Sequence, residues 1–224
     1  SATIRKFDRD GKYLCSLVPP PANLPEDKLG EMGFVEYEPG KRALQGPDLA
    51  SSVAVTAFYL PGYTLDGDTV LSCLPVVAGN RLIFANPGHI YSSQGSFLHY
   101  IYADGSTDTT GIKGLPMVKE KGLHQNSRLA LSPDGKTVYL SGVLNGARGS
   151  SACIYKRSLS ESGPAAAFAG EFGKPGSDNA HFNNAQGIDC DVEGRVYVAD
   201  TANNRIQVFS PEGKHLKTIP VKEP

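Results

Sequence analysis

Residues 187–221 read GIDCDVEGRVYVADTANNRIQVFSPEGKHLKTIPV, four short apolar runs separated by polar turns. The runs cover residues 187–191, 195–199, 205–209 and 215–221. Each intervening turn contains Gly or Asn, the residues that best tolerate the backbone of a tight turn. The pattern predicts four antiparallel strands joined by short turns.

Parts of this pattern recur along the chain. Residues 4–14 and 206–216 both read I-x-x-F-x-x-[DE]-G-K-x-L, 202 residues apart. A second kind of hairpin is anchored by Gly79, Gly135 and Gly194, which are 56 and 59 residues apart. A repeat of this length with about four short strands per unit is typical of a β-propeller blade. The sequence therefore predicts an all-β chain of four-stranded antiparallel blades.

The last unit is also similar to a known repeat family. Residues 182–188, FNNAQGI, and 193–209, EGRVYVADTANNRIQVF, resemble the NHL repeat, and residues 182–219 cover one full repeat. The chain departs from that repeat at Ala185, where proline is usual, and at Cys190, where a small aliphatic residue is more common. The resemblance implies a β-propeller. Because NHL-type rings typically have six blades, it also implies an incomplete ring or a segment of a six-bladed one.

The hairpins define the expected units. Residues 1–18 should form the outer hairpin of a partial blade, because their twin near the C-terminus is an outer pair. Residues 19–68 begin with a Pro-rich connector and are either an insertion or a degenerate blade. Complete blades are expected at 69–113, 114–170 and 171–224. Residues 3–7 should then lie on an open strand edge, paired by a neighbouring molecule or by residues outside this chain.

Composition excludes several functional classes. The 224 residues carry 22 Lys and Arg against 23 Asp and Glu, a net charge of −1. That balance argues against a protein that holds nucleic acid or an anionic membrane through bulk charge. No apolar run approaches the roughly 20 residues of a membrane span. We therefore expect neither a nucleic-acid partner nor a membrane span.

Candidate ligand-binding residues lie where innermost strands are expected to begin. Loops that lead into these strands surround the central channel, where propellers bind ligands. His124 and His181 each precede such a strand, and Gln186 and Asp189 lie at the start of the last one. We hypothesise that these four residues bind a ligand. Ordinary loop polarity is the competing explanation for the histidines.

Two carboxylates are the candidates for a metal site. Asp189 and Asp191 alternate around Cys190, so their side chains should share one face of the strand. Carboxylate oxygens are ligands that calcium prefers. The equivalent strand of the preceding unit, residues 129–131, offers no carboxylate. We therefore expect no cofactor and leave calcium as the alternative.

The four cysteines are spread along the chain. Cys15, Cys73, Cys153 and Cys190 include no two residues at the spacing of a zinc clip, so a zinc site is not expected. They are either small buried hydrophobic residues or partners in disulfides. The frequent use of the NHL repeat in extracellular bacterial proteins, together with oxidisable cysteines, favours an extracellular or periplasmic location.

The motifs of common enzyme classes are absent from the sequence. It contains no G-x-S-x-G motif and no Gly-rich phosphate-binding motif. Our main hypothesis is a noncatalytic interaction or scaffold module of a larger protein, which binds a protein, a carbohydrate or a second copy of itself. One alternative is a propeller enzyme of lyase or lactonase type with a channel metal. Another is a structural subunit of a multichain assembly.

Overall fold

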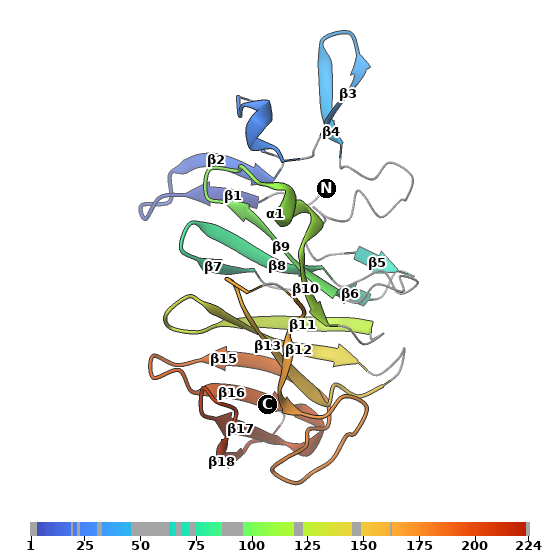
Figure 1. Ribbon diagram of the computed structural model, residues 1–224, viewed down its shortest axis with the longest axis vertical. Helices are drawn as coiled ribbons and strands as arrows, with labels where there is room; N and C mark the ends of the chain where they lie inside the picture. Colours follow the sequence, from blue (N-terminus) through green and yellow to red (C-terminus); the bar gives the residue numbers. More distant parts are fainter. Residues whose placement is uncertain are drawn as a thin grey trace.

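The fold consists almost entirely of antiparallel sheets that follow one another along the long axis of the molecule (Figure 1). The coordinates are a computed structural model. They describe residues 4–18, 20–21, 23–30, 33–45, 63–65, 69–71, 75–86, 96–118, 123–144, 149–161 and 163–222.

Three sheets have four strands each, in which neighbours in sequence are neighbours in space. The first blade comprises β7 (Val76–Ala78), β8 (Arg81–Asn86), β9 (Ser96–Tyr102) and β10 (Leu115–Val118). The second comprises β11 (Leu123–Leu131), β12 (Thr137–Leu144), β13 (Cys153–Ser158) and β14 (Ala166–Gly170). The third comprises β15 (Ala185–Cys190), β16 (Val196–Asp200), β17 (Arg205–Phe209) and β18 (His215–Pro220). These sheets confirm the predicted fold of four-stranded antiparallel blades.

The other described strands form two-stranded hairpins. They are β1 (Ile4–Phe7) with β2 (Tyr13–Val18), β3 (Gly33–Glu38) with β4 (Lys41–Gln45), and β5 (Tyr63–Leu65) with β6 (Thr69–Leu71). Among the described residues, the helices are α1 (Thr109–Lys113) and the 3-10 turns η1 (Glu26–Lys28) and η3 (Thr201–Asn203). Within the described ranges, no helix is long and apolar enough to cross a membrane.

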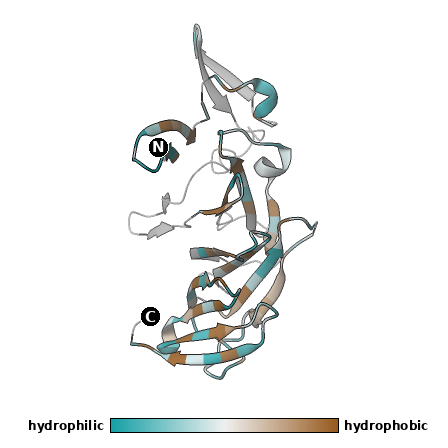
Figure 2. Ribbon diagram, turned by 90° about the vertical axis from the view of Figure 1, so that its left-hand side faces the viewer, coloured by the Kyte–Doolittle hydropathy of each residue, from teal (hydrophilic) through white to brown (hydrophobic). Residues whose placement is uncertain are grey.

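The hydrophobic core lies between neighbouring blades. The first and second blades bury a cluster that includes Ile83, Leu98, Tyr100, Met117, Leu129, Val138 and Leu140. The second and third blades bury one that includes Tyr139, Ile154, Phe168, Phe182, Val196, Val198 and Phe209. Polar and apolar residues alternate along these strands (Figure 2), because successive side chains point to opposite faces of a sheet. Strand β11 contacts both β7 and β15, which places the first strand of each blade next to its neighbour.

Candidate functional site

A group of hydroxyl and amide side chains lies where the chain enters β15. We call Ser150, Asn183, Asn184 and Gln186 the hydroxyl–amide cluster. The main-chain N–H of Asn184 donates to Ser150 Oγ at 2.7 Å, and the Ser150 hydroxyl lies 2.9 Å from Asn183 Oδ1. Gln186 Nε2 donates to Asn184 Oδ1 at 3.1 Å. The cluster therefore joins the loop before β13 to the loop that leads into β15.

The backbone of Asn184 and the neighbouring strand hold this arrangement. Asn184 has φ of 67°, a left-handed conformation that Asn adopts more readily than most residues. The hydroxyl of Ser141 on β12 donates to the main-chain oxygen of Gln186. The main-chain N–H of Ala185 donates to the oxygen of Ser151 at 2.8 Å. Two blades thus meet at the cluster through main-chain as well as side-chain contacts.

Ser151 adds an unused hydrogen-bonding group beside the cluster. Its side chain is buried, and its hydroxyl has no hydrogen-bond partner in the described part of the chain. Buried polar groups normally have a partner, so an orphaned hydroxyl marks a place for a bound water or a ligand group. The cluster and Ser151 together offer donors and acceptors without a net charge.

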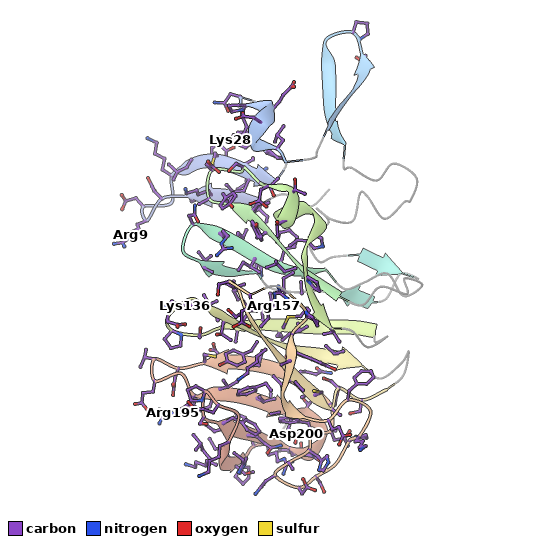
Figure 3. All side chains as sticks on the ribbon, viewed as in Figure 1. Arg9, Lys28, Lys136, Arg157, Arg195 and Asp200 are labelled. Atoms are coloured by element: carbon purple, nitrogen blue, oxygen red, sulfur yellow. The ribbon has the colours of Figure 1, made fainter. Side chains whose placement is uncertain are left out.

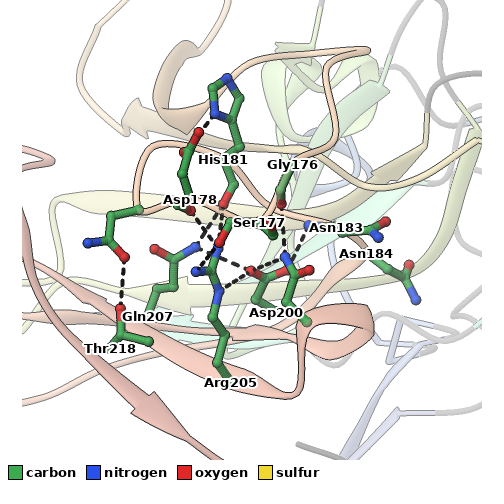
Figure 4. A network of polar contacts seen from close by, with 12 residues as sticks. Gly176, Ser177, Asp178, His181, Asn183, Asn184, Asp200, Arg205, Gln207 and Thr218 are labelled. Atoms are coloured by element: carbon green, nitrogen blue, oxygen red, sulfur yellow. Dashed lines mark hydrogen bonds and ion pairs between the residues drawn. The ribbon is translucent and has the colours of Figure 1, made fainter.

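A buried ion pair lies next to Asn183 of the cluster (Figure 4). Asp200 is fully buried, and its carboxylate accepts from Arg205 Nε at 2.7 Å and from the main-chain N–H of Asn183 at 2.6 Å. Asn203 Nδ2 and Gln207 Nε2 donate to the same carboxylate at 2.8 and 3.3 Å. Because one of these bonds ends on Asn183, the carboxylate positions the cluster directly.

The guanidinium of Arg205 anchors the loop that precedes β15. It donates to the main-chain oxygens of Ser177, Asp178 and His181 at 2.7, 2.6 and 2.9 Å. Gln207 Nε2 donates to the same His181 oxygen at 2.9 Å. These hydrogen bonds fix the backbone of the loop, so its conformation depends on the Asp200–Arg205 pair.

Of the four residues expected to bind a ligand, the structure brings Gln186 into the cluster. His181 Nδ1 lies 2.8 Å from Asp178 Oδ1 on the same loop, and this contact lowers the pKa of the Asp178 carboxyl. Asp189 is exposed and accepts from the N–H of Cys190 at 2.8 Å. His124 pairs with Val143 through the backbone of β11 and β12, and its side chain lies outside the described residues. The ligand-binding roles of these residues stay predictions.

Sequence reasoning missed Ser150, Asn183 and Asn184. Ser150 lies in the loop before β13, and its contact with Asn183 spans 33 residues. Nothing local reveals such a pairing. The one usable signal is the pair of asparagines directly before the innermost strand, inside the stretch that resembles a known repeat.

The proposed metal ligands have other partners. Asp191 Oδ2 accepts from Arg195 Nε at 2.6 Å and from the hydroxyl of Tyr197 at 3.0 Å, which leaves it poorly placed to bind a cation. No group of three or more His, Cys, Asp or Glu side chains that could hold a metal occurs among the described residues. The cluster itself presents only neutral oxygens and amides. Calcium therefore stays a prediction for this chain.

A groove of about 620 Å³ lies at the other ends of the second and third blades, lined by their strand-connecting turns. Two basic side chains line this groove, Lys156 and Arg157, and Lys156 Nζ lies over the Phe168 ring, 5.4 Å from its centroid. Arg157, labelled in Figure 3, donates to the main-chain oxygens of Pro116, Glu161 and Gly163. These bonds tie β13 to the neighbouring blade and to its own following turn. The guanidinium of Arg157 in this groove therefore makes a structural contact.

Three cysteines lie in the described part of the chain, and all three are free thiols: Cys15, Cys153 and Cys190. The fourth, Cys73, is outside it. Burial raises the pKa of the Cys190 thiol to about 12, with a further contribution from the charges of Asp189 and Asp191. Since the thiolate is the reactive form, Cys190 should be inert at neutral pH.

We expect iodoacetamide to alkylate Cys190 at pH 8 about a thousand times more slowly than it alkylates free glutathione, because so little thiolate is present. Peptide mapping by mass spectrometry after timed quenching measures the rate at this residue alone. In the matched variant Asp189→Asn, which removes one neighbouring charge, the rate should rise. A rate within tenfold of glutathione in the unmodified protein would contradict the burial of this thiol.

Comparison with known proteins gives one family and several structures. The model of the family described as SMP-30/Gluconolactonase/LRE-like region matches residues 101–224. No curated protein matches the chain. Regucalcin from Agrobacterium tumefaciens, described as a calcium-binding protein, is 19% identical over 64% of this chain and 43% of its own, with a TM-score of 0.38. A gluconolactonase from Xanthomonas campestris is 17% identical over 84% of this chain and 55% of its own, with a TM-score of 0.43.

Virginiamycin B lyase from Staphylococcus aureus is a third similar structure. It is 14% identical over 99% of this chain and 64% of its own, with a TM-score of 0.43. The chain thus spans between 43% and 64% of the length of these three proteins. All three TM-scores lie below 0.5, so these similarities carry no argument about this chain.

Proposed function

Because this chain belongs to the SMP-30/gluconolactonase/LRE-like family, we propose that it functions in a lactonase-type enzyme that hydrolyses the cyclic ester of a small hydroxylated molecule. The family match carries this proposal. It covers residues 101–224 and therefore the whole hydroxyl–amide cluster. The chain spans only part of the similar structures, so the proposal concerns the enzyme in which these blades take part.

The family match corrects our main hypothesis from the sequence. A noncatalytic interaction or scaffold module is wrong, because the family points to lactonase-type enzymes. The mistake arose from the absence of recognisable catalytic motifs. In a propeller, site residues come from loops that are far apart in the sequence, so a short motif is a poor guide to activity.

The chemistry of the cluster supports a neutral, hydroxyl-rich substrate. An Asn or Gln side chain carries both two donors and an acceptor, and a Ser hydroxyl is donor and acceptor at once. Such groups match the hydroxyls and the carbonyl oxygen of a sugar-type lactone. Asn184 and Gln186 would bind and orient the ring, while the hydroxyl of Ser151 takes a further ligand oxygen or a water. No described member of the cluster titrates near neutral pH, so proton transfer is not assigned to it.

The third blade supplies the framework in this proposal. We propose that residues 182–219 form an NHL-type blade within this family. The turn between β16 and β17 supports this assignment. The side chains of Asn203 and Arg205 both donate hydrogen bonds to Asp200 and so close the turn. These residues position the substrate-binding loop and do not themselves touch the substrate.

We predict that Asn184→Gly lowers kcat/KM for a sugar lactone such as glucono-1,5-lactone by about 10- to 100-fold, the loss of one or two buried hydrogen bonds. Glycine adopts the positive φ of this position without strain, so the change removes the side chain and keeps the backbone. A pH-indicator assay of lactone opening gives the rate.

The matched control is Asn204→Gly, at a second left-handed position outside the cluster, with φ of 50°. It should retain the rate of the unmodified protein. Equal losses in both variants would show that the effect is conformational. If the purified enzyme that contains these blades opens no lactone under conditions where it remains folded, the proposed activity is wrong.

A further inference from the structure

Strand β11 brings Arg128 to the edge of the hydroxyl–amide cluster. Arg128 lies directly opposite Ser141 in the pairing of β11 with β12. Side chains of directly opposite residues share one face of the sheet, with Cβ atoms about 4.5 to 5.5 Å apart. The Ser141 hydroxyl donates to the main-chain oxygen of Gln186, and the next pair on this face, Ala130 and Tyr139, packs against the third blade. Arg128 therefore lies on the face of the second blade that meets the third, at the level of Gln186.

Arg128 differs in its surroundings from Arg205, the other arginine close to the cluster. Arg205 is buried, and its guanidinium donates to Asp200 and to three main-chain oxygens of the loop that precedes β15. Arg128 is half-buried. A guanidinium carries five N–H donors, so a contact on one side leaves donors for a ligand on the other. Arg128 is thus the arginine beside the cluster that a ligand can reach.

The described carboxylates around the cluster do not offset a positive charge at this place. Asp200 is buried and paired with Arg205. Asp178 and Asp189 are exposed, where water and salt screen their charges. A ligand at the cluster therefore meets neutral hydroxyls and amides on the third blade and the charged guanidinium of Arg128 on the second.

The opening of a lactone creates negative charge on oxygens that such a guanidinium can bind. Water adds to the carbonyl carbon, and the ring C–O bond breaks with its electron pair on the ring oxygen, which takes up a proton. The product is a hydroxy acid, which releases its acid proton to the solvent and becomes a carboxylate. The former carbonyl oxygen is negative in the tetrahedral intermediate and is part of that carboxylate afterwards. Charged donors bind such oxygens more strongly than neutral amides do.

We propose that Arg128 is a catalytic residue that binds the acyl oxygens of the lactone, while Asn184 and Gln186 bind its ring. This inference rests on the lactonase function proposed above. The guanidinium stabilises the charge that develops on the carbonyl oxygen, so its contribution is larger in the transition state than in the bound substrate. The same contact holds the carboxylate of the product. The site is therefore selective for a carboxylate over a neutral group at that carbon.

Gluconate and glucitol are matched probes for this contact, because they differ only in having a carboxylate or a CH2OH group at the first carbon. Isothermal titration calorimetry with the enzyme that contains these blades should show gluconate bound at least about tenfold more tightly. In Arg128→Gln the two affinities should lie within about twofold of each other, since the charge is lost and the neutral contacts remain. Arg128→Lys keeps the charge without the planar guanidinium and should give an intermediate ratio.

Arg195→Gln is the matched control. It removes the same charge at the opposite end of β15, where Arg195 pairs with Asp191 and Glu193. Both affinities should stay within about twofold of those of the unmodified enzyme. Equal losses of gluconate binding in Arg195→Gln and Arg128→Gln would show that net charge, and not a contact with Arg128, attracts the carboxylate, and would overturn the proposal.

Kinetics connects the binding contact with catalysis. Arg128→Gln should lower kcat for glucono-1,5-lactone about 100-fold, with a smaller change in KM. Equal affinity of the unmodified enzyme for both probes would overturn the proposal, and so would an equal loss of both probes in Arg128→Gln, because Arg128 would then only maintain the shape of the site. If Arg128→Gln opens the lactone at the unmodified rate, the lactonase function stands and the role of Arg128 is wrong. A folded enzyme that opens no lactone rejects the lactonase function and the catalytic role with it.

Discussion

Phe209→Ala is expected to lower the free energy of unfolding by about 3 to 5 kcal/mol, the usual loss for a phenylalanine removed from a packed core. The ring is 3% exposed and contacts Phe168, Phe182 and His215 at centroid distances of 6.1, 5.6 and 5.6 Å. The ring therefore connects three parts of the structure: the second blade, the loop that precedes β15, and strand β18. Urea denaturation followed by tyrosine fluorescence measures the change.

Phe7, in the N-terminal copy of the sequence repeat, provides a close control for Phe209. Phe7 occupies the same position of the same sequence repeat and makes the same edge-to-face contact with the strand opposite, but half of it is exposed. Phe7→Ala should therefore cost less than about 1 kcal/mol. Similar losses for the two variants would mean that the face of Phe7 is covered in solution. A loss below about 1 kcal/mol for Phe209→Ala would mean that the strand register of the third blade is wrong.

The strands of the third blade were predictable because a hairpin is a local structure. The apolar runs at 187–191, 195–199, 205–209 and 215–221 correspond to β15 to β18 within two residues at each end. Gly and Asn in the turns and alternation in the strands are read directly from neighbouring residues. The same local pattern, repeated along the chain, was sufficient to predict the blades and hence the propeller fold.

The site was much less predictable, because its contacts join distant loops. Gln186 was expected near the site since it lies at the start of an innermost strand, and the structure places it in the cluster. Its partner loop carries Ser150, which no local pattern connects with Asn183. His181 was selected by the same rule as Gln186, but its ring turns to Asp178 while its backbone anchors the loop. Position along a strand is local information, whereas the direction of a loop side chain depends on the whole fold.

The network behind the cluster links stability to the site. Asp200→Ala is expected to lower the free energy of unfolding by about 3 to 5 kcal/mol, because it leaves the guanidinium of Arg205 buried without its counter-charge. Both side chains are almost inaccessible to water, at 0% and 10% exposure, so solvent cannot replace the lost partner. The variant also frees the N–H of Asn183 and the amide of Asn203. We therefore expect the loop before β15 to lose order even in the molecules that remain folded.

Three further variants separate charge, hydrogen bonding and local order. Asp200→Asn keeps an acceptor for Asn183 and should recover part of the lost stability. The double variant Asp200→Ala with Arg205→Met removes both charges and should be more stable than Asp200→Ala alone, since no unpaired charge stays buried. Asp191→Ala breaks the more exposed pair with Arg195 and should cost clearly less. Urea denaturation of the four variants measures this order; if Asp200→Ala is no less stable than Asp191→Ala, the carboxylate does not hold the loop as the structure shows.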